Sequence, residues 1–202
     1  MVEKISKRTG RARTAPASRI LESMTGSDAL SVLRLLAERD DEFAEVIDAT
    51  ARELLGQIDS EDVATDVQME LEFLDVEEVW DRSGARRDGY IDPGDAAWQM
   101  FEDALKPFGD AIEKYKSLSM SREARACCEG ILKGIYDFHR ESSTEYKDWA
   151  VDAPGEFFGQ VLDEWNSLFK RRPPLLEMEE FLHSRCPDWA ERGMRQLRSR
   201  KR

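Results

Sequence analysis

The chain has 202 residues, of which 41% are hydrophobic, 9% aromatic and 36% charged, and its formal net charge is −12 at pH 7. This composition indicates a globular protein that is long enough to bury a real core. No stretch approaches the roughly 18 apolar residues that a membrane span requires, which excludes a transmembrane protein.

The charge is unevenly distributed along the sequence. Residues 1–19 carry six Lys or Arg and one Glu, giving +5, and residues 191–202 also carry six and one, giving +5. This leaves 18 of the 30 basic residues and 40 of the 42 acidic residues to residues 20–190, a net charge of −22. The chain is therefore expected to be an acidic body with two basic ends.

The N-terminal segment indicates both disorder and location. Residues 1–18 are rich in Lys, Arg, Ser, Thr and Ala and offer no apolar face to bury, so we expect a disordered basic tail. This end lacks an apolar signal segment and the chain has three cysteines, an odd number, which favours a reducing, cytoplasmic location. The folded part is expected to be a single all-α domain over residues 19–190. A basic C-terminal tail over residues 191–202 follows and can continue a helix.

Apolar residues at helical spacing fill the first part of this expected domain. The stretch "TGSD" has the form of a capping box that opens a helix, with Thr25 as the cap and Asp28 reaching back. Two further helices are predicted from apolar stripes at residues 43–58 and 63–74, where apolar side chains recur at three- and four-residue steps. These two helices form the first predicted pair.

A break in the helical pattern over residues 79–98 precedes a second pair. Asp92 is expected to cap the first helix of that pair and Pro93 to be its first residue. A third pair is predicted at residues 157–169 and 173–185, and a final helix can run into the basic tail. No stretch shows the alternation or the β-branched enrichment of a strand, so we predict an all-α chain without a β-sheet.

The second pair, residues 95–118 and 121–141, contains residues that helices disfavour. Pro107 lacks an amide proton and clashes with the preceding turn, so it should kink or divide the first helix. Gly130 and Gly134 lie one turn apart in the second helix, which predicts that a neighbouring helix approaches closely there.

Three helix pairs in succession indicate antiparallel helical hairpins, stacked either as a short irregular solenoid or as a closed bundle. The phrases "LDVEEVWDRSG", "GYIDPGDAAW" and "CEGILKGIYDFH" resemble those of a family of uncharacterised bacterial and archaeal all-helical proteins, with hairpins of the HEAT or tetratricopeptide kind. The resemblance covers most of residues 40–170. It implies a helical fold, and it implies no activity.

The residues that could carry metal or catalytic chemistry are badly spaced. Cys128 and His139 are eleven residues apart on one predicted helix, about 16 Å of rise at roughly 1.5 Å per residue, too far to share a zinc ion. An Asp-rich loop from Asp88 fails as a calcium site because Pro93 stands where that loop needs Gly. No G-x-S-x-G nucleophile elbow is present. We therefore predict no metal, no cofactor and no catalytic residue, and a protein that is not an enzyme.

Protein recognition is the function that the remaining residues favour. Aromatic and Arg side chains are enriched at interface anchors, and the middle of the 79–98 stretch combines them without an evident folding requirement. The alternative is that these arginines pair with the acidic helix faces nearby. The candidate partner-binding residues are Trp80, Arg82, Arg86, Arg87 and Tyr90.

The sequence thus predicts a non-enzymatic helical interaction module that presents an acidic surface to a protein partner. The alternative is a nucleic-acid-associated regulator, in which the flexible basic ends and the loop arginines neutralise phosphates. The residues of the two basic ends that would do so are Lys7, Arg8, Arg11, Arg13, Arg198, Arg200, Lys201 and Arg202.

Overall fold

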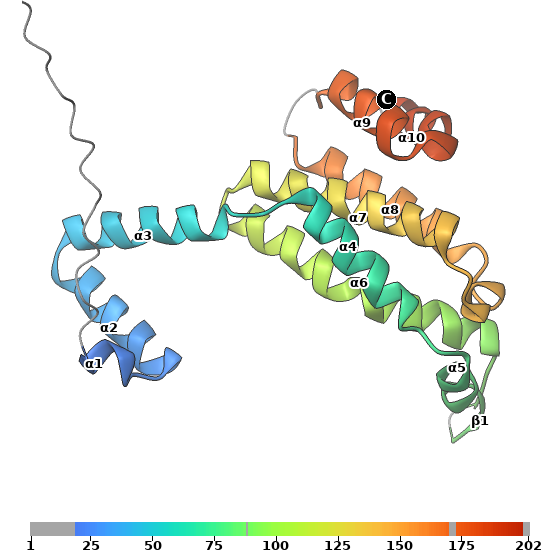
Figure 1. Cartoon of the computed structure of the whole chain (residues 1–202), viewed down its shortest axis with the longest axis horizontal. Helices are drawn as coiled ribbons and strands as arrows, with labels where there is room; N and C mark the ends of the chain where they lie inside the picture. Colours follow the sequence, from blue (N-terminus) through green and yellow to red (C-terminus); the bar gives the residue numbers. More distant parts are fainter. Residues whose placement is uncertain (1–18, 88, 170–172, 200–202) are drawn as a thin grey trace, which may run out of the picture. The chain divides into compact units, whose positions relative to one another are not determined.

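The computed structural model describes residues 19–87, 89–169 and 173–199, and this described part is mainly helical (Figure 1). The chain divides into two compact units, residues 1–54 and residues 55–202. The prediction of a mainly α-helical protein is confirmed. The choice between solenoid and bundle, and the single domain over residues 19–190, stay predictions.

The first unit contains α1 (Arg19–Glu22), α2 (Gly26–Arg39) and most of α3 (Asp41–Leu55). The predicted capping box is present, because the Thr25 side chain accepts from the Asp28 amide and the Asp28 carboxylate accepts from the Thr25 amide. Neither α2 nor α3 has a buried residue. The large hydrophobic side chains that these two helices leave exposed are Leu30, Val32, Leu33, Leu35, Phe43, Val46 and Leu54.

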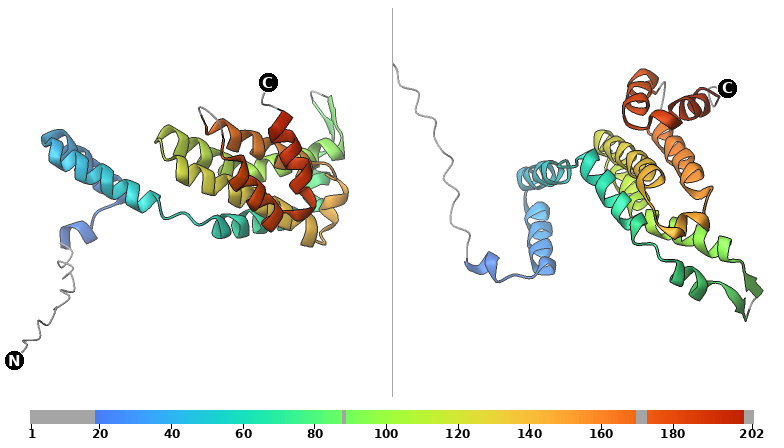
Figure 2. Two further views of the ribbon diagram at one scale, coloured as in Figure 1. Left: turned by 90° about the horizontal axis from the view of Figure 1, so that it is seen from above. Right: turned by 45° about the vertical axis from the view of Figure 1, so that its right-hand side comes forward.

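The second unit holds the hydrophobic core, which surrounds one long central helix, α7. Helices α4, α6 and α8 each pack against α7 (Figures 1 and 2). The elements of this unit are α4 (Ser60–Glu72), α5 (Val76–Arg82), β1 (Gly84–Arg86), β2 (Gly89–Ile91), α6 (Pro93–Ser117), α7 (Ser121–Glu141), the 3-10 helix η1 (Glu145–Asp148), α8 (Ala153–Ser167), α9 (Leu175–Arg185) and α10 (Pro187–Ser199).

Helix α4 packs closely on α7, and two glycines make this approach possible. A Cβ atom at Gly134 would lie 2.6 Å from the Ala64 carbonyl oxygen and 2.6 Å from the Val67 Cβ. A Cβ at Gly130 would lie 2.6 Å from the Val63 Cβ. These distances are shorter than van der Waals contact, so the close approach predicted from the two glycines is confirmed.

Helix α6 begins as predicted and passes through its internal proline. The Asp92 carboxylate accepts from the Gly94 amide at 2.8 Å, and Pro93 is the first helical residue. The helix then runs without interruption to Ser117, so Pro107 does not divide it.

The prediction that the chain has no β-sheet is wrong, because the structure contains one short β-hairpin among its described residues. Strands β1 and β2 pair antiparallel, with Ala85 opposite Tyr90. Gly84 and Gly89 are the first residues of β1 and β2, and they adopt φ values of +91° and +141°, which favour glycine. Each strand has only three residues and β2 is exposed, so no alternation of buried and exposed residues marked it in the sequence.

The C-terminal helices extend the second unit. Helices α9 and α10 pack on each other, and α10 also packs on α8 (Figure 2). Residues 191–199 of the segment expected to be a basic tail belong to α10, where Met194 and Leu197 are buried. None of the described helices combines the length and the hydropathy needed to cross a membrane.

Candidate protein-interaction surface

Trp80 is a large aromatic side chain that is supported on one side and open on the other. It lies on α5, and its residue is 54% exposed. Its ring meets Trp149 edge-on, with 4.8 Å between centroids and an interplanar angle of 76°. Trp149 directly follows η1 and packs against the core. Trp80 is therefore held in position without being covered.

A hollow of about 570 Å³ lies beside Trp80, and we call it the Trp80 hollow. The connection from α4 to α5 and the residues just before and at the start of η1 form its walls. Phe73 contributes a second ring and is 76% exposed. The lining residues are Glu72, Phe73, Leu74, Asp75, Val76, Glu77, Trp80, Thr144 and Glu145.

Local hydrogen bonds fix both walls of this hollow. On one wall, Asp75 caps α5 by accepting from the Glu77 amide at 2.9 Å. On the other wall, the Thr144 side chain caps η1 by accepting from the Tyr146 amide. Tyr146 is itself buried, and its hydroxyl donates to the Ala97 carbonyl of α6. The walls are thus tied to the core rather than carried on a free loop.

The Trp80 hollow is negatively charged. Its lining includes four carboxylates and no Lys or Arg. Asp75 is engaged as a helix cap, whereas Glu72, Glu77 and Glu145 form no ion pair with any residue that the structure describes. Carboxylates beside exposed aromatic faces are a favourable environment for a cationic side chain, because both the charge and the ring quadrupole attract it.

Arg82 does not line the hollow but joins α5 to α6. Its guanidinium donates to Glu78 at 2.8 Å and to Asp103 at 2.7 Å. The hydrogen bond with Asp103, followed by that with Glu78, raises the pKa of Arg82. For this arginine, pairing with neighbouring acidic helix faces is what the structure shows.

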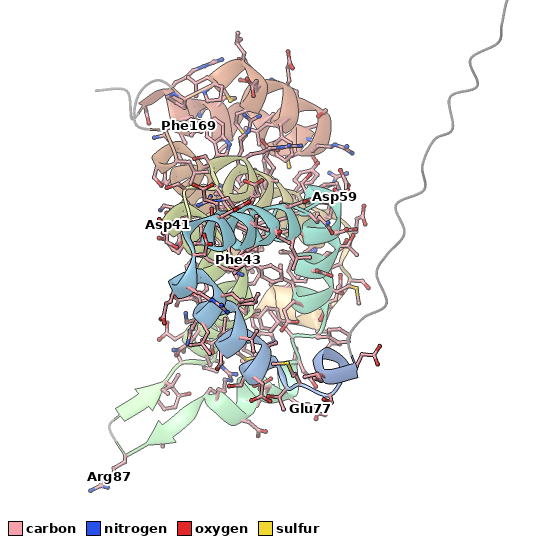
Figure 3. The ribbon with its side chains drawn as sticks, turned by 90° about the vertical axis from the view of Figure 1, so that its left-hand side faces the viewer. Asp41, Phe43, Asp59, Glu77, Arg87 and Phe169 are labelled. Carbon is pink, nitrogen blue, oxygen red and sulfur yellow. The ribbon has the colours of Figure 1, made fainter. Side chains whose placement is uncertain are left out.

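The remaining candidates lie on the β hairpin. Arg86 pairs with Gly89 through the strand backbone. Arg87 lies at the tip and points away from the strands (Figure 3). Tyr90 is 71% exposed on β2. Among the residues that the structure describes with their side chains, Trp80 is the predicted partner-binding residue that contributes to the hollow.

Several residues of the hollow escaped the sequence prediction. Phe73 lies off the apolar stripe of α4 that contains Val67 and Leu71. A large aromatic residue outside such a stripe is expected to be exposed, and this was the one local sign in the sequence that Phe73 belongs to a surface site. Glu145 reaches the hollow through tertiary folding, which no local pattern reveals.

The residues predicted to bind nucleic acid lie almost entirely outside the described part of the chain. Lys7, Arg8, Arg11 and Arg13 precede it, and Arg200, Lys201 and Arg202 follow it. Arg198 is described, and it pairs with Glu179 of α9 at 2.7 Å.

The cysteines and His139 are placed for packing. All three cysteines are free and buried. Burial raises the pKa of the Cys127 thiol to about 11 and that of Cys186 to about 12. His139 lies against the Trp189 ring at 4.7 Å, and its pKa is lowered by burial and then by Lys147 and Arg140. In the described ranges no three His, Cys, Asp or Glu side chains are grouped to hold a metal ion.

Comparison of the chain with known protein families, curated proteins and solved structures found no significant match. The chemistry of the Trp80 hollow is that of carboxylates placed beside exposed aromatic rings.

Proposed function

We propose that the protein is a non-enzymatic interaction module whose Trp80 hollow binds a basic segment of a protein partner. The observation that carries this proposal is the position of Trp80, braced by Trp149 and open to solvent among four carboxylates that have no basic neighbour in the hollow. Aromatic side chains that are rigid before binding lose little conformational freedom and are frequent anchors of interfaces.

An arginine or lysine side chain is the ligand group that fits this surface. Its charge complements Glu72, Glu77 and Glu145, and its flat or extended stem can lie on the Trp80 ring. A cation over an aromatic ring contributes about 0.5–2 kcal/mol, depending on how far it is desolvated. The net charge of −22 on residues 20–190 would also steer a basic partner toward the molecule.

A peptide titration tests the proposal. The full chain is titrated with a short peptide that repeats Gly-Gly-Arg, and binding is followed by fluorescence anisotropy at several salt concentrations. We expect binding that weakens as salt rises, and a loss of about threefold to tenfold in Trp80→Ala. A peptide that repeats Gly-Gly-Glu should not bind.

Charge reversal separates the hollow from the overall charge. Glu77→Lys reverses a charge in the hollow, whereas Asp62→Lys makes the same change of charge at an exposed position of α4 outside it. We expect a clearly larger loss of affinity in Glu77→Lys. Equal losses in the two variants would show that the acidic body as a whole, and not the hollow, attracts the peptide, and would refute the proposed site.

A further inference from the structure

Helices α2 and α3 of the first unit have apolar faces that the described part of the chain leaves uncovered. On α2, Leu33 and Leu36 lie one turn apart, and on α3 Phe43, Val46 and Ile47 recur at three- and four-residue steps. No residue of either helix is buried. Helices of this length are marginal in water unless an apolar face packs on another surface, so both faces are expected to have a partner.

The connection between α2 and α3 prevents the two helices from covering each other. Asp40 is the single residue between them, and its backbone is extended. Its carboxylate accepts from the Glu42 amide at 2.9 Å, which caps α3. Antiparallel helices that lie side by side are joined by about two to five residues. The chain therefore turns a corner at Asp40, and α2 and α3 diverge from it (Figure 1).

Basic side chains stand at the edges of the apolar face of α2. Arg34 follows Leu30 by four residues and Arg39 follows Leu36 by three, so one arginine lies at each edge. Neither arginine forms an ion pair with a residue that the structure describes. Both charges are therefore available to a neighbouring helix.

Acidic side chains stand at one edge of the apolar face of α3. Glu42 precedes Val46 by four residues and Glu53 follows it by seven, which places both glutamates on the same side of the helix. Neither glutamate forms an ion pair with the residues that the structure describes. This edge complements the arginines of α2, whereas it would repel a second copy of itself.

We propose that the protein forms a symmetric dimer in which α2 of each copy packs along α3 of the other. The two helices have 14 and 15 residues, so their lengths match at about 21 and 22 Å for roughly 1.5 Å per residue. A twofold axis forms both contacts at once, because each copy supplies one helix of each kind. The four helices then cover the apolar faces of both copies.

A second copy of this chain fits the two faces better than a partner with one sign of charge. A basic partner would be attracted to α3 but repelled by Arg34 and Arg39, and an acidic partner would be repelled by α3. The first unit itself contains both complementary faces. With their edge charges these faces offer roughly 20 residues per copy, the lower end of the range for a standard interface.

Sedimentation velocity of the full chain tests the proposal. From about 1 to about 100 µM protein, we expect the mass to rise from 23.2 kDa toward twice that value. Leu33→Asp should weaken association at least about tenfold, because it places an unpaired charge in the apolar interface. Ser31→Asp puts the same residue on the opposite, exposed side of α2 and should change the dissociation constant by less than about twofold.

Charge reversal tests the pairing of α2 with α3 and leaves the apolar faces intact. One chain has Arg34→Glu with Arg39→Glu, and a second chain has Glu42→Lys with Glu53→Lys. Each chain alone would place like charges opposite each other and should associate about threefold to tenfold more weakly than the unchanged protein. An equimolar mixture should restore the dimer, because each α2 then meets an α3 of opposite charge. Adding Leu33→Asp to both chains should abolish it.

The proposed dimer does not involve the Trp80 hollow. Trp80→Ala should therefore dimerise as the unchanged chain does, and a loss of association in this variant would place the contact at the hollow and overturn the proposal. A chain that stays monomeric at every concentration would also overturn it, as would equal effects of Leu33→Asp and Ser31→Asp. A mixed dimer that survives Leu33→Asp would show that charge alone joins the chains. Thermal unfolding checks that each variant keeps its folded core.

Discussion

At the scale of single residues, the absence of a methyl group decides how closely α4 approaches α7. A Cβ at Gly134 would lie 2.6 Å from both the Ala64 carbonyl oxygen and the Val67 Cβ. The backbone of α4 would have to move away, and the fully buried Val67 would lose part of its packing. The close packing of α4 on α7 therefore requires glycine at positions 130 and 134.

We predict that Gly134→Ala lowers the free energy of unfolding by about 1–3 kcal/mol, because overpacking outweighs the gain in helix propensity. Urea denaturation measures this change. Gly109→Ala is the matched control and should raise the free energy of unfolding by about 0.5–1 kcal/mol, since its new methyl group meets nothing within 4 Å. Stabilisation by both substitutions would contradict the close packing of α4 on α7.

The buried thiols give a second prediction at this scale. Burial raises the pKa of Cys127 from 9.0 to about 11, so the folded state keeps its proton at pH values where the unfolded state loses it. The stabilising contribution is complete below pH 9 and is lost as pH rises toward about 11. The free energy of unfolding should therefore fall between pH 8.5 and 10, by up to about 1.4 kcal/mol per pH unit for each thiol.

The control protein is Cys127→Ala, whose free energy of unfolding is measured by urea denaturation over the same pH range. Removing this thiol should make the decline shallower, although Cys128 and Cys186 still contribute. If the two proteins show the same slope, Cys127 ionises as freely in the folded state as in the unfolded state.

At the scale of elements, Arg82 connects α5 to α6 through Asp103. Its side chain is 41% exposed and that of Asp103 is 53% exposed, so solvent screens the ion pair. We predict that Arg82→Ala lowers the free energy of unfolding by less than about 1 kcal/mol, and that the effect shrinks in about 0.5 M salt. A larger loss that salt does not change would mean that Arg82 stabilises α5 by packing instead of charge.

Sequence predicted individual helices better than it predicted their partners. Thr25 and Asp92 mark helix starts because capping depends on residues only two or three positions away. The partner of α4 is α7, and that pairing depends on Gly130 and Gly134 far along the chain. Local patterns also gave no sign of the β1–β2 hairpin, which rests on two positive φ angles and buries nothing in β2.

The candidate surface, too, could be predicted from the sequence only in part. Trp80 could be selected from the sequence because it stands at the start of the break in the helical pattern, near the end of α5. The carboxylate of Glu145 joins it from another segment, and the open side of Trp80 depends on how Trp149 packs. These relations exist only after the chain has folded, so composition and spacing could not supply them.

At the scale of the whole molecule, the core is confined to one part of the chain. All buried hydrophobic residues in the described ranges lie between Ala64 and Leu197, and α2 and α3 contribute none. We predict that a chain lacking residues 1–54 unfolds within about 2 °C of the full chain, a difference of less than about 1 kcal/mol. Circular dichroism during heating measures it, and a fall of more than about 5 °C would show that the first unit stabilises the second.

The pairing of α4 with α7 also has a consequence for the order of events on the ribosome. Glu141, at the end of α7, is synthesised about 70 residues after Glu72, at the end of α4, which takes about 4–14 s at about 5–20 residues per second. During that interval Val67 and Leu71, which the finished fold buries completely, lack the helix that α4 contacts most extensively. A nascent chain of this protein therefore presents an apolar helix to chaperones for several seconds before its partner helix has been made.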